Sequence, residues 1–151
     1  MEYYNPITEL EWLYGIWKGE MKTEDIETQT SLKIEPIGKE ILEFNHVLIQ
    51  NNSNYQYEKN TLFYDKLTEN LRLFSVHHEG YIELADIALK SKNAQVEIMS
   101  TFNKGFNLPP NMKIQKKWIF YKKTKQATFE VKMGNNEKII VSAELTFFSK
   151  L

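Results

Sequence analysis

Cysteine is missing from this 151-residue chain, and arginine occurs only once, at Arg72. Without a thiol, the chain has no disulfide framework, no thiolate metal site and no cysteine nucleophile. A large charge of either sign is also lacking, because 19 basic residues face 20 acidic ones and the net charge is −1. Nucleic-acid-binding domains usually carry a clear positive excess, so we expect no nucleic-acid partner.

Long apolar runs are absent as well. No stretch reaches the roughly 20 apolar residues that a membrane helix needs, so no membrane span is expected. Residues 1–6 contain neither the basic nor the apolar segment of a signal peptide, which predicts a cytoplasmic location. Phosphate loops, dinucleotide fingerprints, nucleophile elbows and zinc motifs are also missing, so the sequence predicts no catalytic residue and no metal site.

Aromatic residues, by contrast, are abundant. They make up 13% of the chain, as eight tyrosines, nine phenylalanines and three tryptophans. Such residues favour β-strands and line apolar pockets. The length suits one domain covering residues 1–151. The composition therefore indicates a single β-rich domain with an apolar interior.

One short helix is predicted at the start of the chain. Asn5 is a suitable N-cap and Pro6 suits the first turn. Apolar residues then recur at helical spacing, at Ile7, Leu10 and Leu13. The pattern stops before residue 15, and no later segment shows helical spacing of comparable length.

The rest of the chain alternates between apolar and polar residues, with turn residues at regular intervals. Ten strands are expected, at about 17–26, 30–37, 41–49, 55–64, 71–78, 81–89, 95–102, 112–121, 127–133 and 138–148. One of the turns is Gly134-Asn135-Asn136. Short turns make consecutive strands antiparallel neighbours, and closing the sheet removes its exposed edges. We therefore predict an all-β fold, an antiparallel up-and-down β-barrel of about ten strands with a short N-terminal plug helix.

The segment Gly15-Ile16-Trp17-Lys18-Gly19-Glu20, directly after the helix, resembles the opening of lipocalins and their calycin relatives. Its extended form, W-L-x-G-x-W-x-G, is most similar to nitrobindin-type and fatty-acid-binding-protein-like intracellular barrels. The segment Glu79-Gly80-Tyr81-Ile82-Glu83-Leu84 is similar to the part of those barrels where a strand turns and re-enters. The resemblance implies a calycin barrel that encloses a small ligand.

One departure from the nitrobindin pattern concerns haem. The resemblance implies a haem-ligating histidine close to the C-terminus, but the histidines of this chain are His46, His77 and His78. Haem binding would therefore need a ligand on a different strand. No cofactor is predicted, and a haem or tetrapyrrole protein stays an alternative.

Three polar residues are candidates for fixing the polar end of a ligand. His46 shares a strand face with apolar neighbours, and its alternative role is a buried histidine satisfied by a protein partner. Arg72 and His78 share one face of their strand with Phe74, which offers a cation and an imidazole among apolar groups. The pattern does not decide whether this face or the face with His77 points inward, and a solvent-facing Arg72 is the alternative.

Five aromatic residues are predicted to supply the apolar wall of a pocket, and they are Trp17, Tyr64, Phe74, Trp118 and Phe129. The alternative is that they only fill the core, since lining and filling give the same sequence signal. The pair His77-His78 is not predicted to bind a metal, because adjacent strand residues point to opposite faces.

Most charged residues on the strands are expected to face solvent. Glu83, Glu97, Glu130 and Glu144 lie mid-strand, where a pair of interior carboxylates would allow acid–base catalysis, but alternation favours exposure. Residues 113–125 carry six lysines around aromatic residues. Alternation predicts lysines outside and aromatics inside.

The sequence thus favours a binding protein over an enzyme. We expect a small apolar molecule, fatty-acid-like or aromatic, in the barrel interior beneath the plug helix. The alternatives are a haem or tetrapyrrole protein, an enzyme on a calycin scaffold, and a filled barrel that acts through its surface. The protein is expected to be a monomer or a homodimer.

Overall fold

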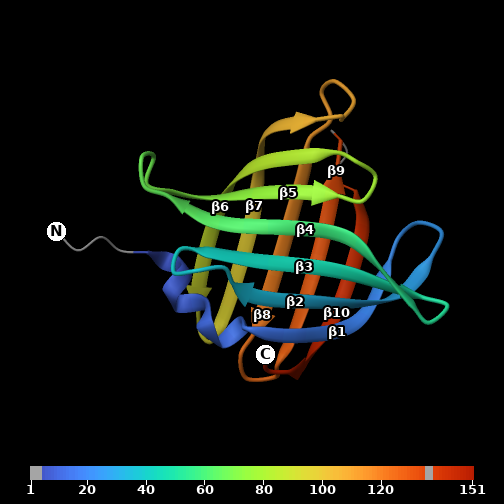
Figure 1. Ribbon diagram of the computed structural model, residues 1–151, viewed down its shortest axis with the longest axis horizontal. Coiled ribbons are helices and arrows are strands. Elements are labelled where there is room, and N and C mark those ends of the chain that lie inside the picture. Colours follow the sequence, from blue (N-terminus) through green and yellow to red (C-terminus); the bar gives the residue numbers. More distant parts are fainter. Residues whose placement is uncertain (1–4, 135–137) are drawn as a thin grey trace.

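The computed structural model describes residues 5–134 and 138–151, and within them the predicted all-β fold is confirmed (Figure 1). Residues 1–4 and 135–137, on which the signal-peptide prediction and one predicted turn partly depend, lie outside the described residues. Ten antiparallel strands close into a barrel in the order β1-β10-β9-β8-β7-β6-β5-β4-β3-β2. The strands are β1 (Gly15–Lys22), β2 (Glu27–Pro36), β3 (Ile41–Gln50), β4 (Ser53–Asp65), β5 (Asn70–His77), β6 (Ile82–Lys92), β7 (Gln95–Phe106), β8 (Ile114–Tyr121), β9 (Gln126–Met133) and β10 (Ile139–Ser149).

The predicted helix is present as a 3-10 helix, η1 (Pro6–Leu13). Asn5 caps it, because its side-chain oxygen accepts a hydrogen bond from the Ile7 backbone N–H at 3.0 Å. The apolar residues at positions 7, 10 and 13 are all buried, and their spacing of three matches the three residues per turn of this helix type. The helix therefore lays one apolar face on the barrel.

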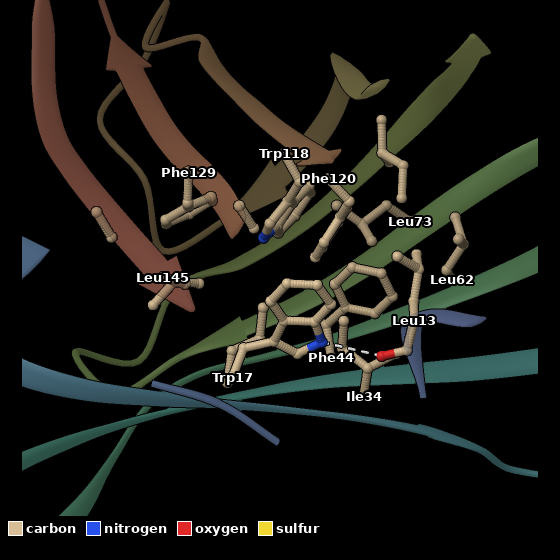
Figure 2. Packing of buried hydrophobic residues seen from close by; sticks show 14 of the residues in the cluster. Leu13, Trp17, Ile34, Phe44, Leu62, Leu73, Trp118, Phe120, Phe129 and Leu145 are labelled. Atoms are coloured by element: carbon tan, nitrogen blue, oxygen red, sulfur yellow. Dashed lines mark hydrogen bonds between the residues drawn. The ribbon is translucent and has the colours of Figure 1, made fainter. Parts of the chain in front are cut away.

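The barrel has a filled end and an open end. Helix η1 is tied to the filled end by a hydrogen bond of 3.0 Å from Trp17 Nε1–H to the Leu13 carbonyl (Figure 2). Strand β1 begins at this end, and the turn after it therefore lies at the other end. The turns β1–β2, β3–β4, β5–β6 and β7–β8 surround the open end.

Strands β1 and β10 close the barrel at Gly19. This residue pairs with Leu145 of β10 and with Thr30 of β2. A Cβ atom on Gly19 would lie only 1.7 Å from the Glu144 carbonyl oxygen. The second glycine of the G-x-W-x-G segment is thus required by a close approach of two backbones.

The ladder between β7 and β8 is shorter than its neighbours. It runs from Gln95, opposite Tyr121, to Met99, opposite Lys117, and no pairs follow toward the open end. Beyond this point the Lys116 backbone N–H donates to Ser100 Oγ at 2.8 Å. A side chain therefore replaces the backbone partner where the two strands separate.

Candidate functional site

The interior near η1 is packed with large apolar side chains. Trp17 packs edge-on against Phe120 at 5.2 Å between ring centroids, and Phe44 packs likewise against Trp118 at 5.4 Å. Trp118 stacks on Phe129 at 5.0 Å. Figure 2 shows these rings meeting across the barrel with leucines from the surrounding strands. All five aromatic residues are buried, so this end of the barrel is a core.

A buried cluster of polar residues lies nearer the open end. The Lys116 ammonium is fully buried and contacts Glu58 Oε2 at 2.9 Å, Glu83 Oε1 at 3.1 Å and Asn60 Oδ1 at 3.2 Å. Asn60 also donates to Glu58 Oε1 at 2.9 Å and accepts a hydrogen bond of 2.6 Å from Ser75 Oγ. The ammonium therefore has three oxygen atoms within 3.2 Å inside the barrel.

A β-bulge places Glu58 in this cluster. The register between β3 and β4 shifts between His46 and Val47, where His46 pairs with Glu58 and Val47 pairs with Gln56. The residue left over is Tyr57, and both Tyr57 and Glu58 are buried although they are consecutive. A bulge redirects side chains in this way, because one extra residue breaks the alternation of the strand.

The two carboxyl groups of the cluster have opposite electrostatic environments. For Glu58, burial acts to raise the pKa, but the charge and hydrogen bond of Lys116 and the hydrogen bond of Asn60 outweigh it, so the pKa lies below its ordinary value. For Glu83, burial dominates and raises the pKa despite Lys116. Neither Glu83 oxygen forms a hydrogen bond of good geometry within the described residues. Lys116 and Asn60 therefore outweigh burial at Glu58, whereas Lys116 does not outweigh burial at Glu83.

His46 lies in the interior beside this cluster, facing inward with Leu42, Phe44 and Leu48 as predicted. Neither ring nitrogen has a hydrogen-bond partner among the described residues, so the alternative of a satisfied histidine is not supported. Its ring packs against Phe129 at 5.0 Å between centroids. Burial lowers the pKa of His46 to about 4, and this effect outweighs the opposing charge of Glu58.

The depressed pKa of His46 predicts that the free energy of unfolding decreases at acidic pH. Between pH 6.5 and 4 the unfolded chain binds a proton that the folded chain excludes, so stability falls as the pH falls through this window. From pH 8 to pH 5 the loss is about 2 kcal/mol, taking an unfolded pKa of about 6.5. Urea unfolding across this pH range should show that His46→Leu removes this part of the loss. If the variant loses as much stability at acidic pH as the wild type, or if His46 titrates near pH 6.5 by NMR, the low pKa of His46 is contradicted.

A cavity of about 750 Å³ occupies the open end of the barrel. Its walls combine apolar side chains from several strands with polar groups from the surrounding turns. The apolar members are Met21, Ile26, Leu48, Leu108, Pro109, Met112, Met133, Ile140 and Val141. A volume of this size is within the usual range for a small-molecule site.

One side of the cavity is an aromatic wall formed by Tyr55, Tyr57, His77, His78 and Tyr81. Tyr81 stacks on His77 at 4.2 Å with an interplanar angle of 9°, and Tyr57 packs edge-on against His77 at 4.9 Å. The two histidine rings are 4.4 Å apart. The predicted separation of these rings onto opposite faces is wrong, because β5 ends at His77 and His78 already belongs to the turn.

Hydrogen bonds hold the two imidazoles of the aromatic wall in place. His77 Nδ1 accepts a bond of 3.2 Å from the Glu79 backbone N–H. His78 Nδ1 lies 3.1 Å from the Tyr57 carbonyl, to which it donates. Burial lowers the pKa of His77 to about 4, so its ring is neutral at pH 7.

The structure distributes the predicted ligand-binding residues over three places. Of the eight, His78 lines the cavity, while Trp17, Trp118, Phe129 and His46 are buried in the interior away from it. Arg72 lies on the outer face, near Asp65 and Asp86, at 3.6 and 3.5 Å. Phe74 is exposed on the outer face, whereas Tyr64 is half-buried on the inner face of the adjoining strand, where it pairs with Leu71 and packs against the core away from the cavity. The face of β5 that points inward is therefore the other one, with Leu71, Leu73, Ser75 and His77.

Sequence reasoning missed the buried polar residues. Lys116 was expected outside with the other lysines, and Glu83 was expected in solvent, but both are fully buried. For Lys116 the sequence did hold a signal. By alternation it lies on the same strand face as Ile114, Trp118 and Phe120, which are also buried. For Glu58 there was none, since its orientation follows from the bulge.

These features define a closed ten-stranded barrel with a filled end, an interior polar cluster and a cavity at the other end. The chain is similar to a solved structure, described as the crystal structure of Rv2717c from M. tuberculosis, with a TM-score of 0.76 at 14% sequence identity. The match covers 98% of this chain and 100% of that chain. At this identity the likeness shows a common fold. No protein-family model and no curated protein matches the chain.

Two further features concern the described part of the chain only. Within residues 5–134 and 138–151, no group of three or more His, Asp or Glu side chains is arranged to hold a metal ion. In the same residues, no helix has the length and hydropathy that crossing a bilayer requires.

Proposed function

We propose that this chain is a calycin-type barrel that binds a small, largely apolar molecule in the cavity at its open end. The observation that carries the proposal is the cavity itself, with an apolar lining, an aromatic wall and about 750 Å³ of space. The sequence placed the ligand beneath the plug helix instead. That position is filled by Trp17, Phe44 and Phe120, so the guest belongs at the opposite end.

The wall residues suit a molecule with an apolar body and a hydrogen-bonding group. The cavity-lining methionines, Met21, Met112 and Met133, are flexible and adapt to different shapes. Tyr57 and Tyr81 stay protonated at neutral pH, because burial raises the pKa of each hydroxyl above its ordinary value. They can therefore offer neutral hydrogen-bonding groups to a guest.

Haem fits this cavity less well than an apolar guest. Imidazoles are present at His77 and His78, but no described residue lining the cavity is lysine or arginine. The two propionates of haem would therefore meet carboxylates with no cation to pair with. Catalysis is not proposed, because Glu58 and Glu83 form ion pairs with Lys116 and do not line the cavity.

Binding of a neutral fluorescent probe tests the proposal. N-phenyl-1-naphthylamine should gain fluorescence when it enters the cavity, and Thr28→Trp should weaken that binding at least about tenfold by filling the space. Thr28 lines the cavity, whereas Thr61 faces outward on β4, so Thr61→Trp is the matched control. Equal binding by the wild type and Thr28→Trp, or no binding at all, would contradict the proposed function.

A further inference from the structure

We propose that the guest of the open-end cavity carries a positive charge, as a cationic amphiphile with a quaternary or protonated amine beside an apolar body. This inference rests on the proposed function and specifies the chemical class of the ligand. It is carried by two independent features of the cavity, the aromatic wall and the sign of the charges that surround it.

The aromatic wall offers a surface for a cation. Its five rings form a continuous series, because Tyr55 lies 6.4 Å from His78, which lies 4.4 Å from His77, and Tyr81 stacks on His77 at 4.2 Å. Tyrosine faces attract ammonium groups through their ring quadrupole, and clusters of such rings recognise quaternary ammonium ions. His77 does not repel a cation, because its low pKa leaves it neutral at pH 7.

The charged groups around the cavity are acidic. Glu24, Asp25 and Glu79 line it, and none of the described lining residues is lysine or arginine. Glu24 is compensated by Lys138, whose Nζ lies 2.8 Å from its Oε1. Asp25 has no ion-pair partner among the described residues, and Glu79 faces only His78 at 3.9 Å, a pair that requires a protonated ring. The uncompensated charge at the mouth is therefore negative.

The buried lysine does not reverse this sign. Lys116 lies behind the aromatic wall, and its ammonium is shared between the carboxylates of Glu58 and Glu83. Arg72, the single arginine, lies on the outer face beside two aspartates. An anionic head group such as a fatty-acid carboxylate would thus find no free cation among the described residues around the cavity, whereas an ammonium group would find carboxylates and ring faces.

Three probes of matched chain length test the inference: octyltrimethylammonium, octanol and octanoate, each below its micellar concentration. Calorimetry should show octyltrimethylammonium binding about tenfold more tightly than octanoate, with octanol between them. NMR shifts should locate the cation at the backbone amides of residues 77–81. Added salt should reduce the difference in affinity between octyltrimethylammonium and octanoate, because exposed charges are screened.

Variants separate the contribution of each feature. Glu79→Gln should reduce the preference for the cation several-fold by weakening octyltrimethylammonium more than octanol. Tyr81→Leu should also weaken the binding of the cation more than that of octanol. Glu97→Gln, a carboxylate on β7 away from the cavity, is the matched control and should have no effect. Glu79 is an exposed turn residue, so its variant tests charge with little risk to folding.

The outcomes distinguish this inference from the proposed function. If octanoate binds the cavity as tightly as the cation, or if Glu79→Gln leaves the preference intact, the cationic class is wrong and the binding function stands. If none of the three probes shifts the cavity residues, the proposed function and the inference both fail.

Discussion

Replacing Lys116 with methionine is expected to destabilise the folded protein by about 3–5 kcal/mol at pH 7, because it leaves two buried carboxyl groups without their cation. Lys116 is fully buried, and its ammonium contacts Glu58 at 2.9 Å and Glu83 at 3.1 Å. Methionine keeps most of the side-chain volume, so the loss reflects charge more than packing. Urea unfolding of both proteins measures the difference.

The same variant should show a distinctive pH dependence. Without Lys116, burial raises the pKa of both carboxyl groups in the folded protein above the unfolded value of about 4.3. Folding then favours the protonated forms, so the variant is closest to the wild type near pH 4 and loses stability as the pH rises toward 8.

Matched variants show whether loss of the buried charge causes the destabilisation of Lys116→Met. Lys117→Met changes the next residue, a partly exposed lysine whose pair with Glu130 spans 3.7 Å, and should cost less than about 1 kcal/mol. Adding Glu58→Gln and Glu83→Gln to Lys116→Met should recover part of the loss at pH 7. A Lys116→Met protein as stable as the wild type across pH 4–8 would show that the ion cluster does not form.

Replacing Gly19 with alanine is expected to cost about 3 kcal/mol, because the added methyl group has no space between β1 and β10. Its Cβ would lie 1.7 Å from the Glu144 carbonyl oxygen and 2.8 Å from the adjoining carbonyl carbon. These are backbone atoms, so relief requires the first and last strands to move apart. That movement opens the junction at which the barrel closes.

Gly38→Ala provides the comparison for Gly19→Ala. Gly38 has a φ of +83° and no atom within 4 Å of an added Cβ. The expected loss of stability in Gly38→Ala, about 1–2 kcal/mol, therefore comes from the backbone conformation. Thermal unfolding of the two variants separates steric from conformational effects. If Gly19→Ala is no less stable than Gly38→Ala, the strands at the junction are not in the close contact described.

Alternation and turn residues were sufficient to predict the strands, because most side chains of a barrel obey a period of two. The helix was predicted from Asn5, Pro6 and three apolar residues, and its cap and buried face match that pattern. The boundaries shifted by a few residues, as at β1, which ends at Lys22 where the sequence suggested about residue 26.

The site was less predictable, for identifiable physical reasons. Glu58 points inward because of a bulge, and a bulge leaves no trace in hydrophobic alternation. Lys116 follows the alternation but violates the expectation that lysines face water, an exception that depends on carboxylates from two other strands. The cavity depends on which end the large rings of Trp17, Phe44 and Phe120 fill, and that follows from strand register.

The early end of the β7–β8 ladder has a mechanical consequence for guest entry. In a closed barrel each strand is clamped by neighbours on both flanks, so widening the rim normally breaks hydrogen bonds. Beyond Met99, β7 keeps its pairs with β6 as far as Phe106 but has none with β8. This arm is therefore held by ladder pairs on one flank only, and it can bend outward to admit a molecule while the ladders of the other described strands stay intact.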